Sequence, residues 1–190
     1  YLLEYDHYAE EEMEFPEDKA DPTFSITYYQ YNGPAQPFTV KSDINHKRQL
    51  EFLESYIEKV YFIVYSALYE DKYYTFDPTY TKLILQQQST PIETISKVID
   101  IQSLVDTYVL YELVCNPDAY WSSFYIGLDM TVRGDKRLIF ESPWDFDSSF
   151  GMRRSYELYD LPFENNFNTP WLALFRDVPW FQEMVREKWK

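Results

Sequence analysis

The chain has 190 residues, of which 45% are apolar and 20% aromatic, so it can bury a sizeable core, and global disorder is not expected. Its formal net charge of −15 repels phosphate backbones, which argues against nucleic acid as a partner. A nucleotide whose charge is balanced by metal ions stays compatible with so acidic a chain.

The first forty residues have the composition of β structure. The opening YLLEY is strand-like, and we interpret it as the start of a fragment cut inside a sheet, with an open strand edge beside Leu2 and Leu3. The stretch FSITYYQY at 24–31 is β-branched and aromatic, and the turn-like NGPAQP follows it. Between these strands, the acidic residues 10–18 indicate a solvated loop or strand edge.

A long core-packing helix is expected next. Apolar residues recur at spacings of three and four, at Leu50, Leu53, Ile57, Val60 and Val64. Asp43 or Asn45 would cap this helix. Within it, residues 61–69 form the longest apolar run, which is too short to span a bilayer because a span needs roughly 20 residues.

Three more helical segments are expected before residue 117. A weaker pattern covers 72–90, Thr90-Pro91 begins a short helix, and Asp100 resembles an N-cap for a buried helix over 101–116. Glu112 falls on an apolar face of that last helix, where it would lie at a solvent edge or pair with a lysine or arginine. Cys115 is the only cysteine, so no internal disulfide is possible, and we expect an inert buried thiol.

After Pro117 the pattern changes to strands. SSFYIGLD and KRLIFESP flank a turn and predict a β-hairpin, whose second strand runs into the loop WDFD at 144–147. Two amphipathic segments, 171–178 and 179–190, close the chain. Internal repeats, linkers and a second domain are not evident in the sequence.

The hairpin suggests a cluster of carboxylates. Because the two ends of a hairpin are close, Asp118 before it can approach Asp145 after it, and Asp147 lies two residues further along an extended segment. Converging carboxylates repel unless cations lie between them, and Mg²⁺ prefers such oxygen ligands. We expect Trp144 and Phe146 to pack inward and fix the loop. A surface loop that closes on a lysine would give a similar pattern.

Other catalytic chemistry has little support in the sequence. The two histidines, His7 and His46, are far apart, which argues against a zinc site or a Ser-His-Asp triad.

Protein kinases use a comparable order of residues, with a catalytic aspartate, a metal-binding position five residues later, a hairpin and a metal-binding aspartate. The stretches NPDAYWSSFYIG and GDKRLIFESPWDFDSSFG, with VDTYVLYELVCNPDA before them, resemble the spore-coat CotH kinase family. YLLEY resembles a strand of the same family, and LFRDVPWFQEMVREKW resembles its closing helix. The resemblance is strongest over residues 100–190.

The resemblance implies an α+β, protein-kinase-like fold of atypical CotH type that transfers a phosphoryl group from ATP, with Mg²⁺ or Mn²⁺, to protein hydroxyls. Asp118 would be the catalytic aspartate, and Asp145 would bind the metal. Asp147 would be a second metal ligand or would stabilise the loop. Asn116 would order the turn at Asp118, and Ser123 stands where many kinases have asparagine. Members of the family are often spore-coat, secreted or cell-surface proteins.

The same resemblance predicts one domain over residues 1–190, with remnant strands of the smaller lobe at 1–40 and the helix-rich lobe with the catalytic hairpin at 41–190. The sequence has no GxGxxG, and no lysine within 1–40 has a strand context, since Lys19 is in the acidic loop. The ATP-contacting lysine would therefore lie upstream, and this fragment alone is expected to be inactive while the longer protein is active.

Two other functions fit the sequence. One is a non-catalytic surface or adhesion module on the same fold, and the other is a binding module that calcium stabilises through the same carboxylates. The expected partner is a protein substrate, without nucleic acid and without a membrane span; the sequence leaves the oligomeric state open.

Overall fold

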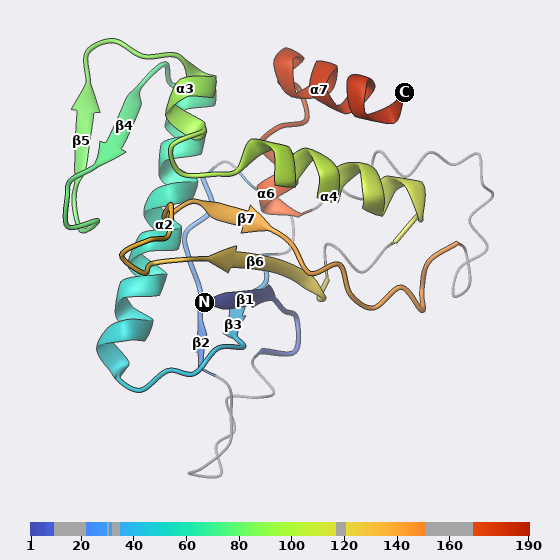
Figure 1. Cartoon of the computed structure of the whole chain (residues 1–190), viewed down its shortest axis with the longest axis horizontal. Helices are drawn as coiled ribbons and strands as arrows, with labels where there is room; N and C mark the ends of the chain where they lie inside the picture. The colour runs from blue at the N-terminus through green and yellow to red at the C-terminus, as the bar shows by residue number, and fades with distance from the viewer. Residues whose placement is uncertain (10–21, 30, 32–34, 117–120, 151–168) are drawn as a thin grey trace.

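A computed structural model describes residues 1–9, 22–29, 31, 35–116, 121–150 and 169–190. Within them the fold is mixed α+β, with helices above an antiparallel sheet and one long helix beside it (Figure 1). The strands are β1 (Leu2–Tyr5), β2 (Thr23–Phe24), β3 (Phe38–Val40), β4 (Tyr73–Phe76), β5 (Leu83–Gln86), β6 (Phe124–Leu128) and β7 (Leu138–Phe140). The helices are α2 (Lys47–Tyr69), α3 (Pro91–Ile95), α4 (Ile101–Leu113), α6 (Pro170–Ala173) and α7 (Pro179–Trp189).

The main sheet has five strands in the order β2-β3-β1-β6-β7, and each pair is antiparallel. The opening segment is a strand, as predicted, but the expected open edge beside Leu2 and Leu3 is wrong. In β1, Leu3 pairs with Val40 of β3 on one side and Ile126 of β6 on the other. Strand β1 is therefore central, because the hairpin returns from far along the chain to cover its second edge.

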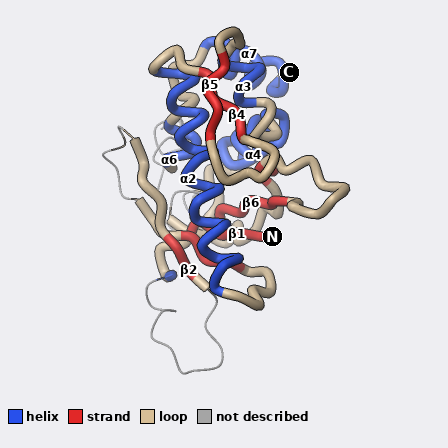
Figure 2. The backbone as a smooth tube through the Cα atoms, turned by 90° about the vertical axis from the view of Figure 1, so that its left-hand side faces the viewer, coloured by secondary structure: helices blue, strands red, loops and turns tan. Residues whose placement is uncertain are grey.

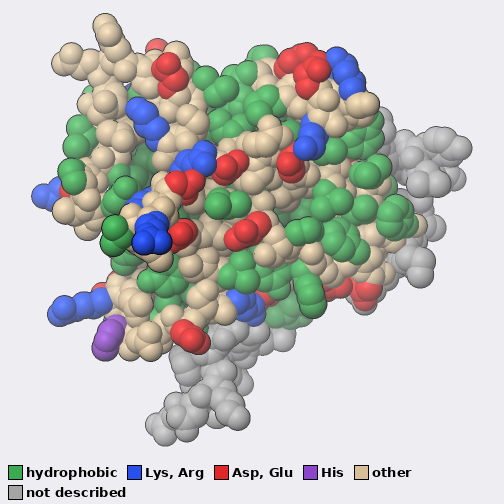
Figure 3. All heavy atoms as spheres, in the orientation of Figure 1, with side chains coloured by type: hydrophobic (Ala, Val, Ile, Leu, Met, Phe, Trp, Pro, Cys, Tyr) green, Lys and Arg blue, Asp and Glu red, His purple; other side chains and the backbone are tan. Residues whose placement is uncertain are grey.

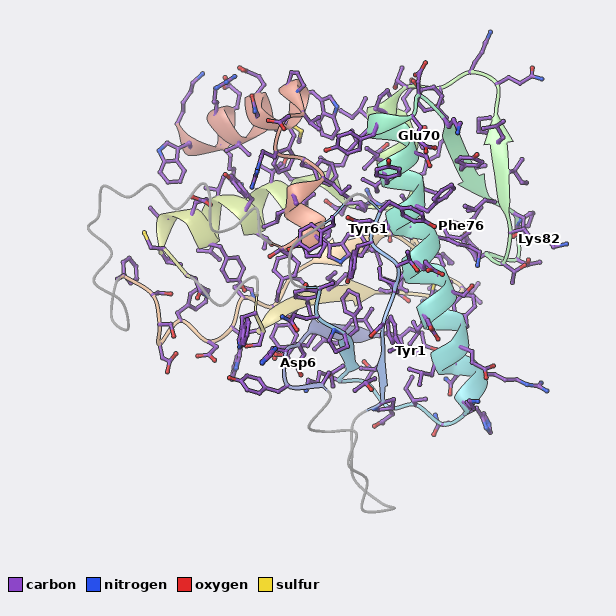
Figure 4. The ribbon with its side chains drawn as sticks, turned by 180° about the vertical axis from the view of Figure 1, so that it is seen from behind. Tyr1, Asp6, Tyr61, Glu70, Phe76 and Lys82 are labelled. Atoms are coloured by element: carbon purple, nitrogen blue, oxygen red, sulfur yellow. The ribbon has the colours of Figure 1, made fainter. Side chains whose placement is uncertain are left out.

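Side chains alternate across this sheet, and one face forms the core. Leu3 and Tyr5 of β1 are fully buried on that face. Trp171 of α6 lies at its centre, with its ring edge-on to Phe38 at 6.5 Å and to Tyr61 of α2 at 5.2 Å between centroids. Tyr61, labelled in Figure 4, also donates its hydroxyl to the Pro170 carbonyl at 3.4 Å. The aromatic excess of the sequence is thus used to fill the space between sheet and helices.

The long helix is confirmed, and it runs along one side of the molecule (Figure 2). Its predicted cap is wrong, because the N-cap position is His46 and not Asp43 or Asn45. The side chain of Gln49 accepts the backbone N–H groups of Asn45 and His46, at 2.8 and 2.9 Å. A side chain in the first turn therefore satisfies the backbone donors of the N-cap residue and of the residue before it.

The helix predicted over 72–90 is wrong. These residues form the hairpin β4–β5, which packs beside α2 in Figure 2. Phe76 stacks on Tyr56 of α2, with centroids 4.8 Å apart and planes 8° apart. Asp77 closes the turn by accepting the backbone N–H groups of Thr81 and Lys82, at 2.9 and 2.8 Å. The aromatic strand and this turn outweigh the weak helical spacing.

Other elements agree with the sequence in position and differ in length. The strand expected over 24–31 is limited to Thr23–Phe24. The helix expected over 101–116 ends at Leu113, followed by a turn in which Cys115 has a φ of 51°. Asp100 caps that helix as predicted, since its carboxylate accepts the N–H of Ser103 at 3.0 Å. The short helix after Thr90, the β6–β7 hairpin and the closing helix are also confirmed.

The surface reflects the acidic composition. On the face shown in Figure 3, Asp and Glu side chains are scattered between hydrophobic ones, with Lys and Arg among them. None of the helices among the described residues is long and apolar enough to cross a membrane.

Candidate functional site

The loop after β7 is tied to the end of α4. The amide Nδ2 of Asn116, a side chain only 2% exposed, donates to the backbone carbonyl of Asp145 at 3.4 Å. The N–H of Phe150 donates to the carbonyl of Val114 at 2.8 Å. The end of α4 and the WDFD loop are therefore in direct contact, although Asn116 and Asp145 are 29 residues apart in sequence.

Both carboxylates of this loop reach solvent. Asp145 and Asp147 are exposed, and the Ser148 hydroxyl donates to Asp147 Oδ1 at 3.2 Å. Ser148 and Ser149 behind them are buried, at 3% and 0% exposed. Asp118 lies outside the described residues, so its approach to Asp145 stays a prediction.

The two aromatic residues of the loop behave differently. Phe146 packs inward as expected, stacked on Tyr111 of α4 with centroids 5.7 Å apart and planes 30° apart. The same expectation is wrong for Trp144, whose side chain is 66% exposed. The reason is the backbone of Asp145, where a φ of 57° interrupts the extended conformation, so residues two apart no longer face the same way.

Ser123 lies at the entry to the hairpin and is buried, at 6% exposed. Its backbone N–H donates to Glu4 Oε1 at 2.9 Å, and its carbonyl accepts the hydroxyl of Tyr111 at 3.1 Å. Tyr111 therefore contacts both Ser123 and Phe146, which places Ser123 and the Asp145 loop on the two sides of one tyrosine.

An ion pair on the sheet was missed by the sequence reasoning. Lys41 Nζ lies 3.2 Å from Glu4 Oε2 and 3.9 Å from Asp6 Oδ2. A lysine in strand context was sought within residues 1–40, whereas Lys41 follows directly after β3. The ion pair could have been suspected from the alternation in YLLEY. This alternation places Glu4 on the face of the strand opposite to the buried side chains of Leu3 and Tyr5.

Left-handed backbone conformations concentrate around the site. Eight described residues other than glycine have positive φ. Five of them lie at the end of α4, at the hairpin entry or in the loop after β7, namely Cys115, Ser123, Ser142, Asp145 and Phe150. Such conformations cost free energy and often mark functional sites, because surrounding contacts must maintain them.

The donor chemistry suits a hard cation bound together with phosphates. The described residues contain no group of three or more His, Cys, Asp or Glu that could hold a metal by itself. Mg²⁺, however, is often bound by one or two carboxylates while substrate phosphates and water complete its coordination. Asp145 and Asp147 are two exposed carboxylates of that kind.

Two expectations about α4 need correction. Glu112 is only 5% exposed, so the solvent edge is wrong, whereas the alternative of pairing with a lysine or arginine stays a prediction. Burial, and then the negative charge of Glu112, raise the pKa of the Tyr108 hydroxyl above its usual value. Cys115 is partly exposed and not buried, because the helix has already ended at this residue; its thiol lies 3.7 Å from the Glu112 carbonyl.

The chain matches the CotH kinase protein family over residues 6–190 and therefore belongs to it, as the resemblance implied. Membership indicates a kinase-like fold and a kinase-like function, and it implies the use of ATP. Searches among curated proteins and among solved structures find no match.

Proposed function

We propose that the protein transfers the γ-phosphoryl group of ATP to serine or threonine hydroxyls of a protein substrate. The observation that carries the proposal is the attachment of the Asp145 loop to the end of α4 through Asn116, in a chain of the CotH kinase family. Phosphoryl transfer depends on positioning and electrostatics more than on covalent chemistry, and an anchored carboxylate loop supplies both.

In this proposal Asp145 is the principal ligand for Mg²⁺ or Mn²⁺. Asp147 is a second ligand or, through Ser148, a stabiliser of the loop. Asn116 holds the backbone of Asp145 in its left-handed conformation. Ser123 contributes a hydroxyl, a weaker ligand than an amide carbonyl, so we assign it a supporting role.

Asp118 is the proposed catalytic aspartate, which accepts a hydrogen bond from the acceptor hydroxyl and orients its oxygen toward the phosphorus. The metal, when bound, offsets negative charge on the phosphates. The chain's own task is to keep Asp118 on one side of the reacting atoms and Asp145 on the other, at the two ends of the same hairpin.

We also propose that residues 1–190 act as one kinase-like domain. Strands β1, β2 and β3 from the first forty residues share a sheet with β6 and β7, which supports treating them as one unit. The division into a lobe remnant at 1–40 and a helical lobe at 41–190 stays part of this proposal.

Thermal unfolding of the full natural protein with Mg²⁺ and ATP tests the proposed site. We expect ATP with Mg²⁺ or Mn²⁺ to raise the melting temperature, because a ligand of the folded state stabilises it by mass action. Asp145→Asn should abolish most of the shift. Asp71→Asn is the matched control, since Asp71 is also exposed and has a similar φ of 53°.

Equal shifts in both variants would place the nucleotide elsewhere. A shift produced by Ca²⁺ without ATP, and none by Mg²⁺ with ATP, would favour a calcium-stabilised binding module instead.

A further inference from the structure

Glu4 occupies the centre of the main sheet, on the face opposite to the apolar core. It lies in β1 between Thr39 of β3 and Tyr125 of β6, and it is only 7% exposed. A carboxylate in such a place is costly unless hydrogen bonds and a positive charge compensate it. The contacts of Glu4 provide these compensating groups, and they also fix neighbouring parts of the backbone.

The first contact fixes the hairpin entry. Glu4 Oε1 accepts the backbone N–H of Ser123 at 2.9 Å, 119 residues away in sequence. Ser123 has a φ of 60°, and β6 begins at the next residue. A hydrogen bond to an ionised acceptor is stronger than one between neutral groups, so Glu4 maintains an otherwise unfavourable backbone conformation.

The second contact fixes Glu4 itself. Its other oxygen, Oε2, pairs with Lys41 Nζ at 3.2 Å, and the lysine side chain is 23% exposed. Lys41 also approaches Asp6, whose Oδ2 accepts the Thr39 hydroxyl at 2.9 Å. Asp6, labelled in Figure 4, follows the last residue of β1. Both carboxylate oxygens of Glu4 therefore have fixed partners, one directly before β6 and one directly after β3.

A tyrosine adds a third contact. Burial, and then the negative charge of Glu4, raise the pKa of the Tyr125 hydroxyl well above its usual value. Tyr125 thus stays protonated and hydrogen-bonds to Glu4. This contact limits the rotation of the Glu4 side chain.

From Ser123 the contacts continue to the carboxylate loop. The Ser123 carbonyl accepts the Tyr111 hydroxyl at 3.1 Å, and the Tyr111 ring stacks on Phe146 at 5.7 Å. Phe146 stands between the two loop aspartates in the sequence. Three consecutive contacts therefore connect the centre of the sheet to the candidate metal loop.

We propose that Glu4 is a positioning residue that sets the hairpin entry through Ser123 and, through Tyr111 and Phe146, the place of the loop carrying Asp145 and Asp147. Its effect on catalysis rests on the proposed function. Its effect on the loop does not, and the two can be measured separately.

Amide hydrogen exchange followed by NMR measures the effect on the loop without any activity. The variants are Glu4→Ala, which removes the acceptor, and Glu4→Gln, which keeps a neutral one. The control is Glu141→Gln, which removes one negative charge from an exposed side chain that covers Gly127 of the same strand pair. Glu4→Ala should accelerate exchange of the Ser123 amide by about tenfold or more and shift the Phe146 amide signal. Glu4→Gln should give smaller changes of the same kind, and the control should resemble the wild type.

Steady-state kinetics of phosphoryl transfer by the full natural protein measures the effect on catalysis. Loss of a group that orients others typically costs about 10- to 100-fold in activity. Glu4→Ala should lower kcat by that amount while the KM for ATP changes by less than about threefold, because alignment and not nucleotide contact is lost. Glu4→Gln should recover part of kcat.

Each outcome decides one of the two claims. An inactive wild type contradicts the proposed function, and the exchange data alone then decide the role of Glu4. A folded Glu4→Ala variant with wild-type kcat, or with an unchanged Phe146 signal, overturns the positioning role. If Glu4→Ala does not fold, Glu4→Gln decides: wild-type exchange and kcat in that variant would overturn the proposal.

Discussion

Asn116 shows how a single side chain can connect distant parts of this chain. It follows the turn that ends α4, and its amide reaches the backbone carbonyl of Asp145. Asn116 is almost completely buried and the hydrogen bond itself is partly buried, so removal of the amide leaves a cavity and a carbonyl that is only partly accessible to water. The loop carbonyl would then lose a partner, and the left-handed backbone at Asp145 would lose one of the contacts that maintain it.

We therefore expect Asn116→Ala to lower the free energy of unfolding by about 1–3 kcal/mol, the usual effect of removing one partner of a hydrogen bond that is at least partly buried. Urea denaturation measures this. Asn45→Ala is the control, because Asn45 is exposed and should change stability by less than about 0.5 kcal/mol. Equal losses in the two variants would mean that the contact with Asp145 contributes nothing.

Ser123 offers a second test at this scale, because its φ of 60° suits glycine better than residues with a Cβ. Ser123→Gly and Ser123→Ala both remove the hydroxyl, and only the glycine relieves the backbone strain. We expect the glycine variant to be more stable than the alanine variant by about 1 kcal/mol in thermal unfolding. A more stable alanine variant would show that the backbone is not strained there.

At the scale of elements, the sequence was informative wherever one local pattern dominated. The spacing of Leu53, Ile57 and Val60 predicted α2, and Asp100 predicted the start of α4. The segment 72–90 was misread because its apolar spacing suits a helix weakly, while the contact of Phe76 with Tyr56 depends on the tertiary fold. A contact between side chains that are distant in sequence cannot be predicted from the local sequence alone.

The N-terminus of α4 is coupled to the hairpin through Asp100. One carboxylate oxygen accepts the Ser103 N–H at 3.0 Å, and the other pairs with Arg137 Nη2 at 3.1 Å, just before β7. Asp100→Ala should cost about 1 kcal/mol through loss of the cap. Asp100→Asn keeps a cap and loses the ion pair, so it should cost less. Chemical denaturation of both variants tests this, and an equal cost would assign the effect to Arg137 alone.

The β4–β5 turn should respond to acid. Hydrogen bonds from Thr79, and then from the backbone N–H of Lys82, lower the pKa of Asp77 from 3.8 to about 2. Because the pKa is lower in the folded state, the carboxylate supports the turn above about pH 4, and this support is lost as the pH falls toward 2. An NMR titration of the Asp77 carboxyl carbon should give a midpoint near 2, and a midpoint near 3.8 would contradict the hydrogen-bonded turn.

At the scale of the whole molecule, the sheet brings the parts of the site together. The hairpin pattern predicted that the loop carrying Asp145 returns toward the residues before the hairpin, but not that Asn116 bonds to the Asp145 carbonyl. The contacts of Glu4 with Ser123 and Lys41 were not predictable, because they depend on the strand order β3-β1-β6. Strand β1 and the β6–β7 hairpin are far apart in sequence and become neighbours only in the folded sheet. The contacts between them therefore could not be predicted from the sequence.

The most direct test of the account is transfer of radiolabelled γ-phosphate from ATP by the full natural protein, either to itself or to a generic protein substrate, in the presence of Mg²⁺ or Mn²⁺. We expect label on serine or threonine with the wild type and with Asp71→Asn. Asp145→Asn and Asp118→Asn should each reduce the rate by about 100-fold or more, because each removes a charge that the reaction needs. Wild-type rates in the Asp145→Asn variant, or no label with any protein including the wild type, would contradict the assignment of this loop as the catalytic site of a kinase.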